Sequence, residues 1–177
     1  FFHATYNLLL ITYNSFPQGQ WVWVHGDNTT NQPGVYGTKG VTAPTNRPGN
    51  RYEAAEWTDN NGNFWLFGGT GNSAGGTYGY FNDLWKYDPV NNMWTWVNGD
   101  NIVYQPGSYG VQGIPAPSNK PSAREGSISW KNKYGIWFFG GYGKIGTYGQ
   151  LNDLWKYIPD KPNPDFTSTG NCGSVAF

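Results

Sequence analysis

The 177-residue chain carries 11 acidic and 11 basic side chains, and only 12% of its residues are charged. This balance leaves no electrostatic footprint for nucleic acid and no polybasic stretch for an anionic membrane. Aromatic residues reach 19%, together with 26 glycines and 12 prolines. Because bulky rings suit half-buried strands and glycine and proline suit turns, the composition predicts an all-β protein.

The chain begins with an apolar stretch, FFHATYNLLLITYNSFPQGQ, over residues 1–20. Its run Leu8–Ile11 is far too short to span a bilayer. We interpret residues 1–18 as the remnant of a signal peptide that lacks its basic start, which predicts export. The alternative is an ordinary strand, because Leu10–Asn14 weakly resembles a later block of the sequence.

From Trp21 onward the chain repeats itself, and this repetition is the strongest signal in the sequence. The matched blocks are residues 21–28 with 94–101, 32–37 with 105–110, 64–69 with 136–141, and 82–87 with 152–157. The members of each pair lie 70 to 73 positions apart, and the last pair, NDLWKY, is identical. The sequence therefore contains two duplicated units that differ by small loop insertions.

Each unit contains four strand-like segments, which in the first unit are residues 52–58, 64–67, 83–87 and 93–97. The first segment corresponds to residues 125–131 of the second unit. A turn rich in Asn, Asp and Gly follows it, and a glycine pair ends the second segment before a Gly/Tyr-rich loop. Four antiparallel strands per repeat, with glycine pairs at fixed positions, describe a blade of a β-propeller.

The order of these blocks resembles kelch repeats: a glycine pair after an aromatic strand, then Asn-Asp-Leu-Trp-x-Tyr, Asp-Pro and a Trp-x-Trp strand. The resemblance covers residues 20–159 and is closest to the long-loop kelch repeats of secreted bacterial proteins. It implies the propeller type of the galactose-oxidase central domain, in a protein that is secreted or displayed on a bacterial surface. The structural residues of the repeat would be Gly68, Gly69, Asp83, Trp85, Trp94, Trp96, Gly140, Gly141, Asp153, Trp155, Arg51 and Arg124.

Two pairs of charged residues occupy identical places in the two units, and repetition favours a structural task for them. We expect Asp83 and Asp153 to accept hydrogen bonds from backbone N–H groups at a strand entrance. We expect Arg51 and Arg124, which open the first strand of each unit, to pair with loop carbonyls or acidic side chains.

The second unit leaves the repeat pattern at Ile158 before any Trp-x-Trp strand, while Trp21–Val24 is a Trp-x-Trp strand without a unit of its own. We therefore expect residues 19–159 to form two four-stranded antiparallel kelch blades, the second completed by the N-terminal strand. Closed propellers have at least four blades. Either the sequence is incomplete, which we favour, or chains self-associate to complete a propeller.

Residues 160–177 differ in character from the repeats. A Pro-rich linker leads to Cys172 and a final Val-Ala-Phe, which weakly resembles the opening of an immunoglobulin-like PKD module of bacterial surface proteins. The alternative is a frayed tail. Cys172 is the one cysteine of the chain, so an intrachain disulfide is impossible.

Metal and cofactor chemistry finds little support in the sequence. The copper site implied by galactose-oxidase-type enzymes uses two His and two Tyr ligands, whereas this chain has only His3 and His25. Residues 59–63 imitate a calcium loop but lack its downstream Glu, and the second unit replaces them with a Lys-containing turn, so a hairpin turn is the better interpretation. We predict no metal, no cofactor and no catalytic residue.

The long inserts 28–50 and 101–123 are the best candidates for binding, because loops on a rigid scaffold usually carry function. The candidate residues are Tyr36, Tyr104, Tyr109, Asn28 and Asn101. Tyr and Asn suit stacking on sugars or contacting a protein at low entropic cost. The sequence thus predicts a non-catalytic interaction module for protein or glycan.

Three alternatives remain open. The inserts could simply pack between blades. The chain could be a fragment of a carbohydrate-active enzyme whose catalytic residues lie in other blades, or a purely structural repeat of a large adhesin. Fold alone does not choose among these functions.

Overall fold

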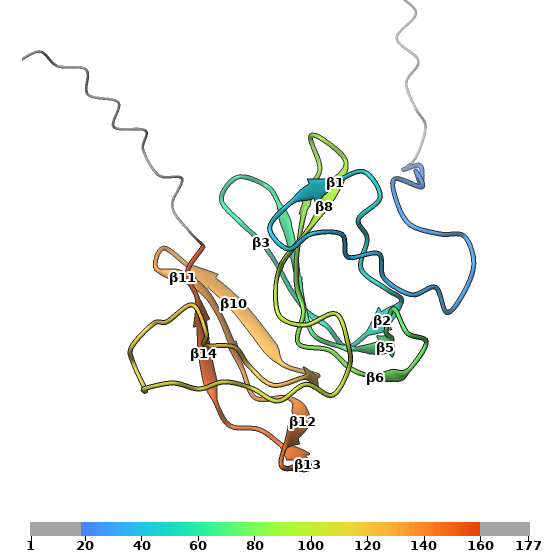
Figure 1. Cartoon of the computed structure of the whole chain (residues 1–177). Coiled ribbons are helices and arrows are strands. Elements are labelled where there is room, and N and C mark those ends of the chain that lie inside the picture. The colour runs from blue at the N-terminus through green and yellow to red at the C-terminus, as the bar shows by residue number, and fades with distance from the viewer. Residues whose placement is uncertain (1–18, 160–177) are drawn as a thin grey trace, which may run out of the picture.

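The computed structural model describes residues 19–159, and within that range the protein is all-β. Its strands form four antiparallel sheets, of which two are large and two are small (Figure 1). The expected signal segment 1–18 and the tail 160–177 with Cys172 lie outside the described residues. No helix in the described range is long and apolar enough to cross a membrane.

The first large sheet has the strand order β1-β8-β7-β4-β3, with every neighbouring pair antiparallel. The bounds are β1 Thr42–Ala43, β3 Ala55–Thr58, β4 Phe64–Phe67, β7 Leu84–Asp88 and β8 Met93–Asn98. Strands β4, β7 and β8 agree within one residue with the segments expected from the sequence. Strand β1 comes from the long insert and adds a fifth strand beside β8, which the repeat pattern did not indicate.

The second large sheet has only three strands, in the order β10-β11-β14. Their bounds are β10 Ile128–Asn132, β11 Gly135–Phe139 and β14 Leu154–Tyr157. It packs against the first sheet, and the core between them consists of Ala55, Trp57, Trp65, Phe67, Leu84, Ile136 and Phe138. At the centre the rings of Phe67 and Phe138 stack with centroids 4.5 Å apart and planes inclined by 25°.

The expectation that the N-terminal strand completes the second sheet is wrong for this chain. Trp21–Val24 is exposed and is not part of a sheet. An ion pair of 2.8 Å between Asp27 and Arg47 holds the following turn against the first repeat. The first sheet therefore lies between Trp21–Val24 and β14 (Figure 1).

Each repeat also forms a small sheet, which joins the start of an expected strand to the Gly/Tyr-rich segment that was expected to be a loop. One sheet joins β2 Arg51–Tyr52, β5 Thr70–Asn72 and β6 Tyr78–Tyr80, and the other joins β9 Arg124–Glu125, β12 Tyr142–Ile145 and β13 Thr147–Gln150. The expected strand 52–58 is divided at Glu53, whose φ of 52° ends β2 before β3 begins. In the second unit Gly126, with a φ of 65°, divides the expected strand 125–131 in the same way.

The glycine pairs form the corners between large and small sheets. Gly69 has a φ of 87°, and a Cβ there would lie 2.6 Å from the carbonyl oxygen of Tyr52. Gly141 repeats this geometry with a φ of 94° against the carbonyl of Glu125. Because an L side chain tolerates neither the positive φ nor the close approach, only glycine fits these corners.

Hydrogen bonds between the two repeats connect the small sheets as well. The amide of Gly69 donates to the carbonyl of Arg124 over 2.8 Å, and the amide of Gly126 donates to Glu53 over 2.9 Å. The Thr70 hydroxyl donates to the Glu125 carboxylate. The two repeats thus share one continuous scaffold.

Candidate functional site

A buried network centred on Asp83 organises the first repeat. The Arg51 guanidinium donates from Nη1 to Oδ1 over 2.6 Å and from Nη2 to Oδ2 over 2.9 Å. The Tyr36 hydroxyl and the Trp85 indole N–H also donate to Oδ2, over 2.6 and 2.7 Å. Arg51 further donates to the carbonyl of Gly68, so the glycine corner is tied to the network.

The second repeat builds the same network around Asp153. Arg124 donates to both carboxylate oxygens over 2.5 and 2.7 Å, and its Nη1 also donates to the carbonyl of Gly140. The hydroxyl of Tyr109 and the indole of Trp155 donate to Oδ2 over 2.7 and 2.6 Å. Matched partners in both repeats indicate a structural task for these residues.

The network of the second repeat stabilises the charged form of Asp153. Burial alone would raise the pKa of Asp153, but hydrogen bonds from Arg124, Tyr109 and Trp155 outweigh it and lower this pKa to about 2. Burial and the hydrogen bond to Asp153 raise the pKa of Tyr109 to about 12. Both groups therefore keep one protonation state at neutral pH, unlike a general acid or base that must exchange its proton.

The repeat pattern indicated a structural task for these Arg and Asp residues, but the hydrogen-bond donors to the Asp carboxylates differ from those expected. Arg51 and Arg124 pair with carbonyls and acids, as expected. The carboxylates of Asp83 and Asp153 accept from side chains, whereas backbone N–H groups were expected as donors. Three strong side-chain donors converge on each acid, and a bidentate guanidinium is the best match for a carboxylate.

The five binding candidates of the inserts occupy three different settings. The Tyr36 ring is buried and packs on Trp85 of the first large sheet, with ring centroids 4.9 Å apart. Tyr109 holds the equivalent place in the second repeat and retains 41% exposure. Asn28 and Asn101 are exposed on the turns that follow the ion-paired Asp27 and Asp100. Tyr104 joins a group of tyrosine side chains.

Tyr104 belongs to a cluster of four tyrosines that comes from both repeats. Its ring lies edge-to-face against Tyr80, with centroids 5.6 Å apart, and against Tyr148, with centroids 6.0 Å apart. Tyr80 also contacts Tyr142 and Tyr148, over 6.0 and 6.1 Å. Edge-to-face pairs at these separations are favourable, so the rings hold one another in place.

The backbone fixes the position of Tyr104. Its φ is 63°, and its amide donates to the carbonyl of Tyr80 over 2.8 Å. Gly79 lies beneath the ring, where a Cβ would approach Tyr104 to 2.5 Å. The insert therefore docks its tyrosine onto strand β6, and a larger residue at position 79 would displace it.

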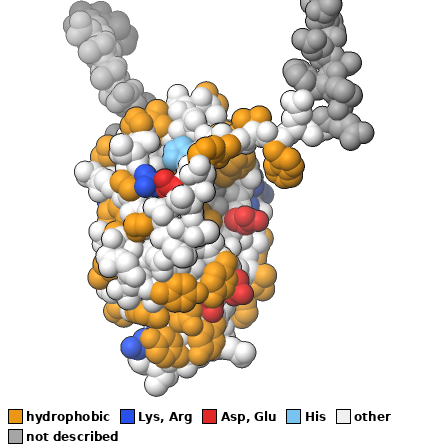
Figure 2. Space-filling model, turned by 90° about the vertical axis from the view of Figure 1, so that its right-hand side faces the viewer, with side chains coloured by type: hydrophobic (Ala, Val, Ile, Leu, Met, Phe, Trp, Pro, Cys, Tyr) orange, Lys and Arg blue, Asp and Glu red, His pale blue; other side chains and the backbone are white. Residues whose placement is uncertain are grey.

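Two further tyrosines extend the cluster along the small sheets. The hydroxyl groups of Tyr78 and Tyr52 are hydrogen-bonded to each other over 3.0 Å, and this hydrogen bond raises the pKa of Tyr52 to about 12. We call the set Tyr52, Tyr78, Tyr80, Tyr104, Tyr142 and Tyr148 the tyrosine surface. All except Tyr80 are at least 36% exposed. Figure 2 shows hydrophobic side chains gathered near the lower end of one face, at the level of these strands.

The tyrosine surface carries little charge of its own. The ammonium group of Lys144 lies 5.2 Å from the centre of the Tyr148 ring, and Glu125 lies near Tyr80. Burial and the charge of Glu125 raise the pKa of Tyr80, so its hydroxyl remains neutral at physiological pH. The surface thus offers aromatic faces and neutral hydroxyl groups, a chemistry suited to sugars and to protein surfaces.

The sequence analysis missed most of this surface. Tyr80, Tyr142 and Tyr148 lie next to glycines in segments that were treated as plain loops. The available signal was the alternation of Tyr and Gly on both sides of each turn, which is typical of a short hairpin with its rings on one face.

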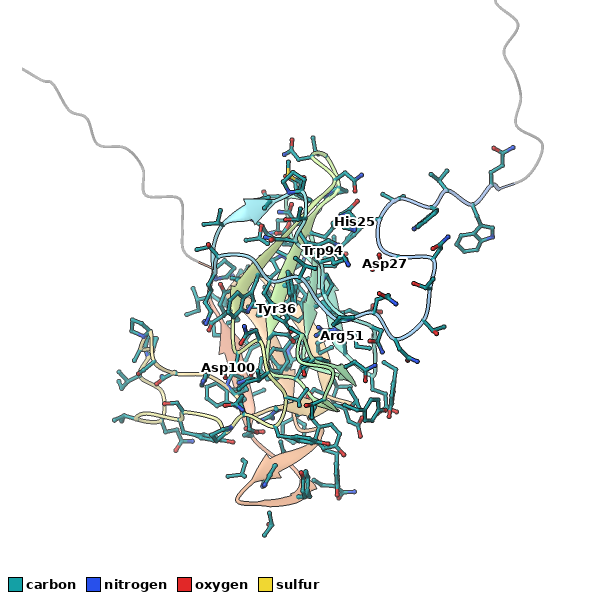
Figure 3. The ribbon with its side chains drawn as sticks, turned by 45° about the vertical axis from the view of Figure 1, so that its right-hand side comes forward. His25, Asp27, Tyr36, Arg51, Trp94 and Asp100 are labelled. Carbon is teal, nitrogen blue, oxygen red and sulfur yellow. The ribbon has the colours of Figure 1, made fainter. Side chains whose placement is uncertain are left out.

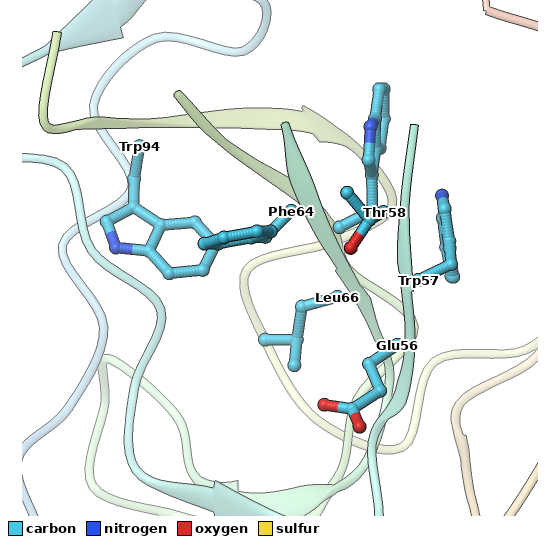
Figure 4. Close-up of a pocket in the computed structure, with 7 residues that line it drawn as sticks. Glu56, Trp57, Thr58, Phe64, Leu66 and Trp94 are labelled. Carbon is cyan, nitrogen blue, oxygen red and sulfur yellow. The ribbon is translucent and has the colours of Figure 1, made fainter. Parts of the chain in front are cut away.

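A groove lies on the first large sheet, apart from the tyrosine surface. It is a groove of about 400 Å³, lined by Glu56, Trp57, Thr58, Phe64, Trp65, Leu66 and Trp94 (Figure 4). One carboxylate stands among mostly apolar side chains, and this is not the pair of acids that glycoside hydrolysis requires. Within residues 19–159, no group of three His, Cys, Asp or Glu residues could hold a metal ion.

The acidic turn 59–63 is occupied by its own hydrogen bonds. The Asp59 carboxylate accepts from the amides of Asn61 and Asn63 over 2.8 and 3.0 Å, and from the Trp65 indole over 2.9 Å. Burial acts to raise the pKa of Asp59, but these donors lower it overall. The turn therefore closes the hairpin between β3 and β4.

No family model and no curated protein matches the chain. Among solved structures, 23 chains match. One of them, described as "Structure of YjhT", is 25% identical with a TM-score of 0.37, over 54% of this chain and 22% of that chain. The chain thus spans about a fifth of that structure, and a TM-score of 0.37 defines no shared fold.

Proposed function

We propose that residues 19–159 are blades of a kelch-type β-propeller, and that the protein is a non-catalytic interaction module that binds a glycan or protein ligand. The observation that carries the proposal is the tyrosine surface, where rings from two repeats and one insert meet on a rigid scaffold. Tyrosines present large contact areas at low entropic cost, which is why they dominate binding surfaces.

The propeller interpretation is supported by repeated local geometry. Both repeats place an Arg-Asp network, a glycine corner and a small sheet at matching positions. The first sheet has the four antiparallel strands expected of a blade, and the second sheet packs face to face on it. Export to a bacterial surface rests on residues 1–18 and on the kelch resemblance, and it remains an expectation from the sequence.

The experiment that tests the function is binding of the full chain to a panel of neutral oligosaccharides, followed by calorimetry on each hit. We expect Tyr104→Ala combined with Tyr148→Ala to weaken binding at least tenfold, because each favourable contact of an aromatic ring contributes about 0.5–1.5 kcal/mol beyond the area that it buries. The matched control is Tyr134→Ala. That tyrosine is 61% exposed on the turn between β10 and β11, outside the tyrosine surface.

The outcomes separate the candidate functions. Binding that survives the double substitution would show that the tyrosine surface is not the site. Oligosaccharide cleavage by the purified chain would overturn the non-catalytic proposal. If every oligosaccharide fails to bind, the glycan arm is rejected and a protein ligand is left, to be mapped by crosslinking through the same two tyrosines.

A further inference from the structure

The packing between the two large sheets joins two different faces of the same repeat. The first sheet contributes Ala55, Trp57, Trp65, Phe67 and Leu84, which we call face A. The second sheet contributes the opposite side of its own strands, with Ser129, Ile136, Phe138 and Trp155, which we call face B. The interface is therefore heterologous, because face A of one sheet packs on face B of the other and not on a second face A.

The second sheet carries an uncovered face A. Its members are the repeat equivalents Ile128, Trp130, Trp137, Phe139 and Leu154. Leu154 is 54% exposed and Phe139 is 38% exposed, whereas the equivalent Leu84 and Phe67 are 4% and 3% exposed. An apolar sheet face of this kind is typical of an interaction surface.

The first sheet carries a face B that is covered at Trp85 and Tyr87 but open around Phe64. Phe64 is 49% exposed there, whereas its equivalent Ile136 is 2% exposed between the sheets. The groove shown in Figure 4 lies on this face, with Glu56, Leu66 and Trp94 along its walls. The molecule thus presents one half of its own internal interface at each end.

The edge strand of the second sheet also has a counterpart in the chain. In the first sheet β8 covers β7, with Trp96 opposite Trp85 and Trp94 opposite Tyr87. Strand β14 is the edge of the second sheet among the described residues. Trp21–Val24 has the Trp-x-Trp-Val pattern of β8, and Trp21 and Trp23 are 102% and 67% exposed.

One side-chain hydrogen bond of Trp21–Val24 matches a hydrogen bond of β8. The Trp23 indole donates to the carbonyl of His25 over 3.1 Å, as the Trp96 indole does to Asn98 over 2.8 Å. The segment therefore has the indole geometry of an outer strand before it pairs with any sheet.

The segment also stands in the right place. The ion pair Asp27–Arg47 ties it to the first repeat as Asp100–Lys120 ties β8 to the second. His25 lies edge-to-face against Tyr87, with ring centroids 6.1 Å apart. Figure 3 shows His25 and Asp27 beside Trp94, at the face B end of the first sheet. Trp21–Val24 therefore has the same position relative to the first sheet as β8 has relative to the second sheet.

We propose that a second copy of this chain docks head to tail, with its uncovered face A on face B of the first copy. The Trp21–Val24 segment of the first copy then adds to β14 of the docked copy as a fourth strand. The register follows from the first sheet, with Trp23 opposite Trp155 and the Asn119 amide within reach of Trp21, as Asn46 donates to Trp94 over 3.3 Å. Because the formal net charge is zero, electrostatic repulsion between two copies is weak.

The experiment is sedimentation velocity of the full chain over a micromolar concentration series, with one charge placed on each face. We expect wild-type protein to form species heavier than the 19.7 kDa chain. Leu154→Asp on face A and Phe64→Asp on face B should each give a monomer. An equimolar mixture of the two variants should give a dimer and nothing larger, because one intact A face and one intact B face remain.

The control and the readout of folding keep the test decisive. Val90→Asp, at a turn position that is 87% exposed, should assemble as wild type does. Circular dichroism and Trp emission should show that both face variants stay folded, since each site is about half exposed. Trp21→Ala with Trp23→Ala should weaken assembly at least tenfold without changing the isolated chain.

A monomeric wild-type chain throughout the series would overturn the proposal. A dimer formed by either face variant alone would also overturn it, because it would indicate a symmetric interface between like faces. These outcomes are independent of the tyrosine surface, so the failure of one proposal leaves the other standing.

Discussion

Arg51 and Asp83 form a bidentate ion pair whose side chains retain only 5% and 0% of their exposure. In the equivalent pair the Arg124 side chain is 1% exposed, while that of Asp153 is 16% exposed. One network therefore exists in two solvent environments within a single chain, which allows its energetics to be measured against an internal reference.

Asp83→Ala should destabilise the protein by about 3–5 kcal/mol, because it leaves a buried guanidinium without its counter-charge. Asp153→Ala should cost less, roughly 1–3 kcal/mol, since water reaches that network more easily. Urea unfolding followed by Trp fluorescence measures both. Lys131→Ala, at an exposed position, is the control and should change stability by less than about 0.5 kcal/mol. An equal or larger cost at Asp153 would contradict the role of burial.

Acid should weaken the fold through Asp153. Its pKa is about 2 in the folded chain, against 3.8 for the unperturbed group. The unfolded chain therefore binds a proton first as the pH falls, and the stabilisation, complete above about pH 5, is lost progressively toward pH 2. Urea midpoints measured between pH 6 and pH 2 should show this loss, and Asp153→Asn should flatten the profile. An unchanged profile in that variant would exclude Asp153 as the source.

Substitutions at two glycines allow the cost of backbone strain to be measured apart from the cost of steric overlap. Gly99 and Gly62 have φ values of 80° and 82°, but a Cβ at Gly99 would overlap the carbonyl oxygen of Asn82, while one at Gly62 meets open space. Gly62→Ala should cost roughly 1–2 kcal/mol, the penalty of a left-handed L residue. Gly99→Ala should cost about 1–3 kcal/mol more. Calorimetric melting temperatures compare them, and equal losses would refute the overlap at Gly99.

The hairpin turn at Asp59 should be indifferent to calcium. Asp59→Ala removes an acceptor shared by Asn61, Asn63 and Trp65, and should cost about 1–2 kcal/mol. Millimolar calcium should leave the melting temperature of the wild-type protein unchanged, because ligand binding to the folded state would raise it. A calcium-dependent rise that disappears in Asp59→Ala would instead establish an ion site.

Much of the large-sheet architecture could be predicted from the repeat. The block at Asn82–Tyr87 recurs without change, and β7 and its equivalent β14 repeat the hydrogen bond from the Trp indole to the Asp carboxylate. The small sheets could not be predicted, because their strands are short and glycine-rich and depend on corners that one repeat builds against the other. The break at Glu53 is an example, since its φ of 52° occurs where the Glu53 carbonyl accepts a hydrogen bond from Gly126 of the other repeat, a contact that the sequence pattern does not indicate.

The candidate site was predicted only in part. Tyr36 and Tyr109 occupy the same sequence position in their inserts, yet one is buried and the other is 41% exposed. The difference arises from β8, which covers Tyr36 through a ring contact with Trp96 at 5.1 Å. A one-dimensional pattern cannot report whether a neighbouring strand is present, and Tyr104 was distinguished only by its contacts in space.

The stacked pair Phe67–Phe138 has a consequence for the stoichiometry of any closed assembly of these sheets. Its two rings, inclined by 25° at the centre of the junction, help to set how far one sheet is rotated from the next. If every junction repeats this packing, the number of sheets that completes a full turn depends in part on the size of the side chains in this one layer. Replacing Phe67 or Phe138 by a smaller side chain would then change the number of sheets in the closed assembly.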